Sequence, residues 1–161
     1  MNILEFAMEK EKFSKDYYRR LADRSTSKGL MEIFNMLADE EAKHYKIIKQ
    51  LKDKVPETAA DTDVLSDAKD IFKRMRENAG EFNFDENELG IYKKAQDIEK
   101  ESREFYLEKA SQVDDPYQKR IFRRLAAEEK KHFFLLDNII EFVSRPQQWL
   151  ENAEFVHLDE Y

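Results

Sequence analysis

Two short motifs, each a glutamate followed three residues later by a histidine, are the part of this sequence best suited to chemistry. They are Glu41-Ala42-Lys43-His44 and Glu129-Lys130-Lys131-His132. In a helix this spacing places both side chains on one face, so a carboxylate and an imidazole can approach the same cation. A further glutamate, Glu11 or Glu99, stands thirty residues before each motif. The pattern predicts a metal site with four carboxylate and two imidazole ligands.

The two motifs belong to an internal repeat. A shift of 88 residues lays residues 33–44 on residues 121–132, and eight of the twelve positions are identical. The same shift, without a gap, lays Tyr18 on Tyr106. One Glu-x-x-His motif alone is a weak signal in an acidic chain and is often a surface pair. Its repetition, with the two preceding glutamates, indicates two structurally related halves that share one site.

The elements that must position these residues are helices. Apolar residues recur at helical spacing over about residues 3–23, 28–53, 85–112 and 115–144. The expected helix starts are the capping boxes Asn2/Glu5 and Asp85/Glu88, and the N-cap Asp115 before Pro116. The turn predicted near residues 25–28 lies midway between Glu11 and the first Glu-x-x-His motif. The turn predicted near residues 114–115 lies midway between Glu99 and the second motif. The sequence therefore predicts an all-α fold, a four-helix bundle of two related antiparallel hairpins, with all six residues at one level.

One long connection joins the two hairpins. It spans residues 54–84 and contains apolar spacing typical of a short helix, at about residues 62–78. We expect a single bundle domain, residues 1–144, followed by a tail, residues 145–161. The tail aromatics, with Phe82 and Phe84 of the connection, suggest packing either on the bundle or on a second subunit, and a homodimer is expected.

The burial of these ligands is the physical argument for metal. Glu41 and His44 interrupt an apolar seam of the second helix, and Glu129 and His132 interrupt the equivalent seam of the fourth. A buried, unpaired carboxylate costs several kcal/mol, and no Lys or Arg occupies a neighbouring seam position. Two divalent cations would balance four carboxylates, whereas a metal-free interpretation requires a set of buried histidine–glutamate salt bridges.

Composition excludes other classes of site. The 161 residues include no Cys, which excludes disulfides and thiolate-ligated metals, and only three Gly and three Pro, which favours helices. The net charge of −7 argues against a nucleic-acid partner. No apolar run approaches the length of a membrane span, and no signal peptide is recognisable, so we expect a cytoplasmic protein.

Four further residues are candidates for supporting roles. Tyr18 and Tyr106 lie two turns beyond Glu11 and Glu99, where a hydroxyl could reach a ligand carboxylate on another helix and deliver protons; plain core packing is the alternative. Glu40 and Glu128 directly precede the motif glutamates. Metal-bound histidines usually donate their second N–H to a carboxylate, so Glu40 is predicted to serve His132 and Glu128 to serve His44; two solvated glutamates are the alternative. His157 has no such pattern and is expected to be a surface or packing residue.

The order of the six ligands, with a long connection between the hairpins, resembles the rubrerythrin branch of the ferritin-like superfamily over about residues 3–144. Glutamates on two helices with Glu-x-x-His on two others are the ligand set of ferritin-like di-iron and di-manganese bundles. The resemblance implies two iron ions bridged by carboxylates, although the same donors accept manganese or a mixed pair. It further implies reduction of hydrogen peroxide or a reaction with dioxygen.

The sequence departs from full-length rubrerythrins in two respects. They carry a rubredoxin domain with paired Cys-x-x-Cys motifs, so a chain without Cys implies an external electron donor, such as a rubredoxin-type protein. They also carry an additional glutamate one turn after the third-helix ligand, where this chain has Ser102, matched by Ser14 in the other half. Oxidation or storage of iron, oxygenation of an organic substrate and a metal-free helical interaction module stay open as alternatives.

Overall fold

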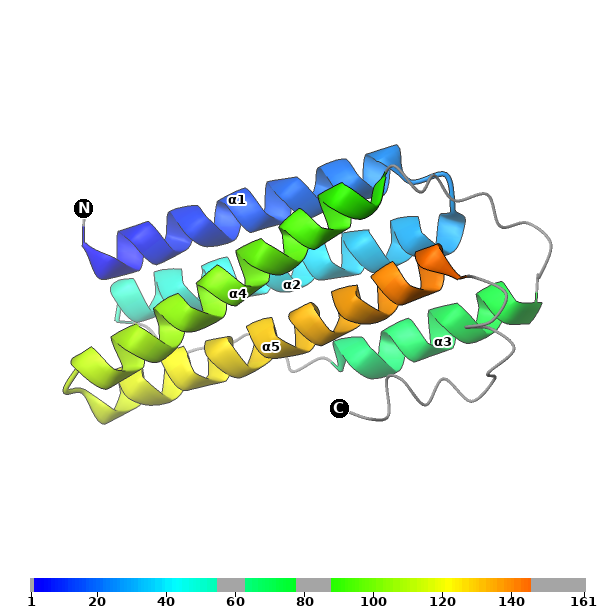
Figure 1. The fold of residues 1–161 in the computed structure, drawn as a ribbon. Coiled ribbons are helices and arrows are strands. Elements are labelled where there is room, and N and C mark those ends of the chain that lie inside the picture. Colours follow the sequence, from blue (N-terminus) through cyan, green and yellow to red (C-terminus); the bar gives the residue numbers. More distant parts are fainter. Residues whose placement is uncertain (1, 55–62, 78–87, 146–161) are drawn as a thin grey trace.

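Five helices make up the part of the chain that this computed structural model describes, residues 2–54, 63–77 and 88–145. They are α1 (Ile3–Arg24), α2 (Lys28–Lys52), α3 (Val64–Glu77), α4 (Leu89–Gln112) and α5 (Pro116–Ser144). The pairs α1–α2 and α4–α5 form two antiparallel hairpins that pack into a four-helix bundle, and α3 lies along its side (Figure 1). The predicted all-α bundle of two hairpins with a long crossover is confirmed.

The helix starts predicted at Asn2 and at Asp115 are confirmed. Asn2 Oδ1 accepts a hydrogen bond of 2.8 Å from the Glu5 N–H at the start of α1. Asp115 caps α5 in the same way, and Pro116 occupies the first turn. The capping box predicted at Asp85 and Glu88 lies largely outside the described residues; within them, α4 begins at Leu89 and Glu88 makes no side-chain cap hydrogen bond. The Glu88 carboxylate instead pairs with the Arg24 guanidinium at 3.1 Å.

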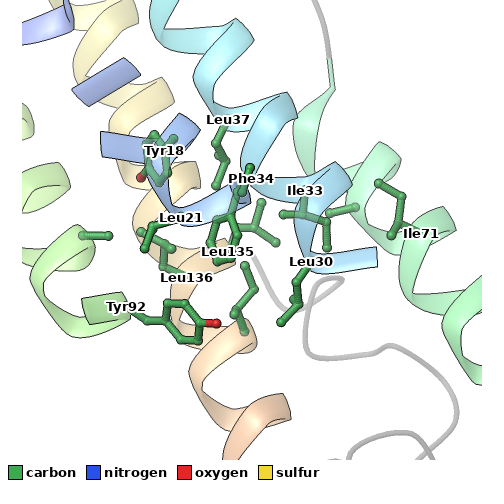
Figure 2. Close-up of a cluster of buried hydrophobic side chains, with 14 of the residues drawn as sticks. Tyr18, Leu21, Leu30, Ile33, Phe34, Leu37, Ile71, Tyr92, Leu135 and Leu136 are labelled. Atoms are coloured by element: carbon green, nitrogen blue, oxygen red, sulfur yellow. The ribbon is translucent and has the colours of Figure 1, made fainter. Parts of the chain in front are cut away.

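The apolar core is divided in two along the bundle axis. One cluster lies at the α3 end and includes Phe34, Leu37 and Leu135 (Figure 2). The second lies near the α4–α5 turn and includes Ile48 and Leu125. Along α2, Glu41 and His44 stand between the residues of the first cluster and those of the second. The candidate ligands therefore form a polar layer with apolar packing on both sides.

The helix predicted at about residues 62–78 corresponds to α3, which contacts α2 and α5. Phe72 packs on Phe142 with ring centroids 5.3 Å apart. Gly29 of α2 lies against the Met75 side chain of α3, which would have to move if residue 29 carried a Cβ, since that Cβ would stand 2.2 Å from Met75 Sδ. No described helix is long and apolar enough to cross a membrane. Phe82, Phe84, His157 and the tail from residue 146 lie outside the described residues, and so do the predictions made for them.

Candidate metal centre

All six residues of the predicted ligand set meet inside the bundle. Each helix of the four-helix bundle contributes: α1 and α4 one glutamate each, α2 and α5 one Glu-x-x-His motif each. The six residues are at most 2% exposed: Glu11, Glu41, His44, Glu99, Glu129 and His132. The sequence predicted that these residues lie at one level because they are equally far from the hairpin turns, and in the structure they form one buried layer.

The six residues divide into two overlapping groups, each close enough to share one ion. Glu11 and His44 belong to the first group, and Glu99 and His132 belong to the second, while Glu41 and Glu129 belong to both. Within each group the donor atoms lie within 4.8 Å of one another. This geometry suits two ions, each held by one glutamate and one histidine of its own and joined by two shared glutamates.

Each imidazole reaches across the bundle to the other hairpin. His44 Nδ1 lies 2.8 Å from Glu129 Oε1, and His132 Nδ1 lies 2.9 Å from Glu41 Oε1. The two rings stack in parallel, with centroids 5.7 Å apart. Nδ1 is therefore the nitrogen that each ring directs toward the carboxylates, and the two hairpins are joined through the centre.

The hydrogen bonding of the centre fits a bound cation. Apart from His44 Nδ1 and Glu129 Oε1, which contact each other at 2.8 Å, five buried oxygen and nitrogen atoms of these six side chains have no hydrogen-bond partner among the described residues: Glu11 Oε2, Glu41 Oε2, Glu99 Oε2, Glu129 Oε2 and His132 Nε2. Buried acceptors without donors are rare in native proteins. Carboxylate oxygens and imidazole nitrogens are also the donors that divalent iron and manganese accept. The residues present therefore fit a dinuclear metal centre.

Without a metal ion, the centre retains protons. Burial raises the pKa of Glu41 and Glu129 well above the usual value, and the neighbouring carboxylates raise it further. The histidine pKa values are raised as well, because the surrounding glutamates outweigh the opposing effect of burial. Burial also raises the pKa of Glu99, but the charge of His132 and nearby hydrogen bonds dominate and lower it to about 2. The metal-free centre thus balances its charge with protons that cations would displace.

Two tyrosines form hydrogen bonds with Glu11 and Glu99, the two glutamates that each belong to only one of the ligand groups. The Tyr18 hydroxyl donates a hydrogen bond to Glu99 Oε1, and the Tyr106 hydroxyl donates one to Glu11 Oε1. Of the two interpretations open from the sequence, hydrogen bonding and plain packing, the structure shows the hydrogen bond. Burial and the adjacent carboxylates raise both phenol pKa values well above 10.0, so the hydroxyls remain protonated donors at neutral pH.

Comparison with known proteins agrees with this geometry. The rubrerythrin family model matches residues 2–140. The chain belongs to the rubrerythrin family. A solved structure of a hypothetical protein from Pyrococcus furiosus has the same fold, with a TM-score of 0.60, 23% identity and 87% of each chain covered. No curated protein matches the chain. Membership places this chain among ferritin-like di-iron domains, and its buried glutamate–histidine cluster is the place where metal would bind.

Beside this rubrerythrin-type centre lies a third group of candidate ligands. Glu40, Glu128 and a ring nitrogen of His132 lie within 4.8 Å of one another. The pairing predicted between Glu40 and His132 agrees with this group. Glu128, expected at His44, instead joins Glu40 at His132. A sequence signal for this was available: Glu128 precedes His132 by four residues, so both share one face of α5.

The serine positions make the two halves of the centre alike. Ser14 and Ser102 are 2% and 3% exposed and lie one turn after Glu11 and Glu99. The position one turn after Glu11 and the position one turn after Glu99 therefore both carry a buried serine in place of a carboxylate.

Proposed function

We propose that this protein is a rubrerythrin-type di-iron oxidoreductase of the cytoplasm that reduces hydrogen peroxide, or reacts with dioxygen, with electrons from a separate donor protein. The observation that supports this proposal is the buried set of four glutamates and two histidines, which forms two ligand groups that share Glu41 and Glu129. Two ferrous ions, when bound, supply two electrons, which is the number needed to cleave the O–O bond of one peroxide. The balance is H₂O₂ plus two electrons and two protons to two H₂O.

The residues of the chain would bind and orient rather than react covalently. Glu11 and Glu99 would each hold one ion, and the hydroxyls of Tyr106 and Tyr18 fix one oxygen of each. This restricts the carboxylate to one orientation and directs the other oxygen, which has no hydrogen-bond partner, toward the ion. The apolar clusters on both sides exclude bulk water, so the electrostatic interactions inside are stronger than in solution.

Protons for the two product waters would come through polar residues at the edge of the centre. The tyrosines keep their protons at neutral pH and return to the same state after each turnover. Electrons would come from outside the chain, because it contains no Cys with which to hold a rubredoxin-type iron. A rubredoxin-type protein is the proposed donor.

Oxidation of ferrous iron for storage or transfer is the second candidate function. Its support is the buried pair Ser14 and Ser102, which leaves the two halves alike and without the additional glutamate that rubrerythrins use. A centre with equivalent halves can oxidise iron without exchanging ligands.

Stopped-flow mixing of the anaerobically loaded diferrous protein separates these functions. One sample is mixed with peroxide and a parallel sample with dioxygen. We expect one peroxide consumed per centre and a faster reaction with peroxide than with dioxygen. A markedly faster dioxygen reaction, with continued turnover of added ferrous iron, would instead support iron oxidation. Glu41→Gln, which removes one shared carboxylate charge, should lose both reactions, whereas Glu104→Gln on the exposed face of α4 should lose neither.

A further inference from the structure

Aromatic side chains of α1 and α4 meet on one outer side of the bundle. Phe6 packs on Phe105 with ring centroids 5.3 Å apart, and Phe13 packs on Tyr17 at 6.4 Å. The Tyr17 hydroxyl donates a hydrogen bond of 2.9 Å to the Ile91 carbonyl of α4. Phe6 and Phe13 are 46% and 53% exposed, and α3 packs on the other side, against α2 and α5 (Figure 1). The four rings Phe6, Phe13, Tyr17 and Phe105 are called the α1–α4 surface below.

The α1–α4 surface is connected to the metal centre by aromatic contacts. In each half of the internal repeat, a ring of this surface is followed directly by a buried tyrosine: Tyr17-Tyr18 and Phe105-Tyr106. The rings of Phe105 and Tyr106 are 5.4 Å apart, and the Tyr106 hydroxyl donates a hydrogen bond to Glu11. A continuous series of contacts therefore leads from the exposed ring of Phe6 through two further rings to a candidate ligand.

Three cationic side chains lie over the rings of the α1–α4 surface. Lys10 Nζ lies within 5.7 Å of two ring centroids, and Arg20 and Lys109 each lie 5.6 Å from one. Among the described residues, Lys109 is the one of the three with a carboxylate in ion-pair distance, that of Glu108 at 3.9 Å. An acidic chain, of net charge −7, thus has an aromatic surface that carries positive charge.

We propose that a small acidic electron-carrier protein docks on the α1–α4 surface and that electrons enter the metal centre there. The inference rests on the proposed function, which requires an external electron donor, and names the surface of this chain that receives it. Each docked carrier would be oxidised by one electron. Two carriers in succession would return two ferric ions to the ferrous state without forming or breaking a covalent bond, which restores the two electrons that one peroxide consumes.

The chemistry of the surface suits an acidic protein. Exposed aromatic rings supply the apolar contact area that is enriched at the core of protein interfaces. The cations around them attract an acidic partner and orient it as it approaches. Because one buried tyrosine separates the ring of Phe105 from Glu11, a carrier bound here approaches the centre without any opening of the bundle.

The test uses the iron-loaded full chain and, as the probe, a rubredoxin of net negative charge. Binding of the two oxidised proteins is measured by calorimetric titration at low and at moderate salt concentration. Stopped-flow absorbance then follows the reduction of the peroxide-oxidised chain by reduced rubredoxin. Dithionite, a small reductant that needs no docking surface, is the reference reaction for the state of the centre.

Two variants perturb the α1–α4 surface. Lys10→Gln/Lys109→Gln removes two of its charges, and Phe6→Ala removes one of its exposed rings. The matched controls make the same changes at exposed positions outside this surface: Lys46→Gln/Lys49→Gln on α2 and Phe133→Ala on α5.

We expect the wild type to bind rubredoxin more weakly as the salt concentration rises, because salt screens the attraction between exposed charges. The lysine variant should bind about tenfold more weakly at low salt and depend less on salt. Phe6→Ala should also bind about tenfold more weakly, as expected for an aromatic residue at the centre of an interface. Both variants should be reduced more slowly than the wild type by the same subsaturating concentration of rubredoxin, and at the wild-type rate by dithionite. Both controls should match the wild type.

Three results overturn docking on the α1–α4 surface: no binding of rubredoxin to the wild type, binding to the two variants as tight as to their controls, or weaker binding without slower reduction. Sedimentation of the wild type and of Phe6→Ala tests for another occupant. A wild-type dimer that becomes monomeric in this variant would assign the surface to a second copy of the chain, and so would also overturn the proposal. A chain that binds no iron, or whose diferrous form reacts with neither peroxide nor dioxygen, would instead remove the proposed function, so the two failures are distinguishable.

Discussion

Filling the centre with metal should release protons, and their number follows from the structure. Without metal, His44, His132, Glu41 and Glu129 all have raised pKa values. Metal binding requires neutral imidazoles and ionised carboxylates. At pH 6, below the usual histidine pKa of about 6.5, two imidazoliums must lose their protons, and the two shared glutamates contribute up to two more. We therefore expect between two and four protons released per chain.

Calorimetric titration with Mn²⁺ in buffers of different ionisation enthalpy measures this number directly. The apparent binding constant should rise with pH between pH 6 and 8, since protons compete with metal. The control Glu104→Gln should release as many protons as the wild type. Release of fewer than one proton per chain at pH 6, with two ions bound, would refute the charge balance described for the metal-free centre.

The remaining predictions concern stability and stoichiometry. The metal-free protein should lose stability as pH rises above about 6.5, by up to about 1.4 kcal/mol per pH unit for each proton held in excess by the native state; denaturant unfolding at pH 6 and 8 that shows the opposite trend would contradict this. Tyr106→Phe should lower the unfolding free energy of the metal-free protein by about 1.5–3 kcal/mol, because Glu11 loses a charge-assisted hydrogen bond, while Tyr117→Phe on the surface should change it by less than about 0.5 kcal/mol. Leu125→Ala should cost about 2–5 kcal/mol in chemical denaturation through the cavity that it leaves, and a cost under 1 kcal/mol would mean that this core is not packed as described. His132→Ala should reduce the tightly bound Mn²⁺ from two to one, and two retained ions would show that this imidazole is not a ligand.

The six candidate ligands could be predicted from the sequence because two independent patterns, the i, i+3 spacing and the internal repeat, point to the same residues. The i, i+3 spacing specifies a helix face, and the repeat specifies that the faces of two hairpins meet. Neither depends on how far apart the helices stand. The contacts that do depend on it were harder to predict: His44 approaches Glu129 of the other hairpin, and Glu128 lies at His132 rather than at His44.

Helix ends show the same division between local and long-range causes. The starts at Asn2 and Asp115 follow from hydrogen bonds within four residues, which the sequence specifies. At the start of α4, Glu88 makes no side-chain cap hydrogen bond and pairs with Arg24 of α1, sixty-four residues away. The hydrogen bonds of Tyr18 and Tyr106 also join residues far apart in the sequence. The sequence therefore could not distinguish a hydrogen-bonding role from plain core packing for these two residues.

The central claim is a dinuclear metal centre held by four glutamates and two histidines. Its most direct test is the metal content of the chain after anaerobic loading with ferrous iron and removal of excess metal. The account predicts two iron ions per chain, and their loss in the double variant Glu41→Gln/Glu129→Gln, which removes both shared carboxylates. Fewer than two ions in the wild type, or two ions retained in that variant, would contradict it.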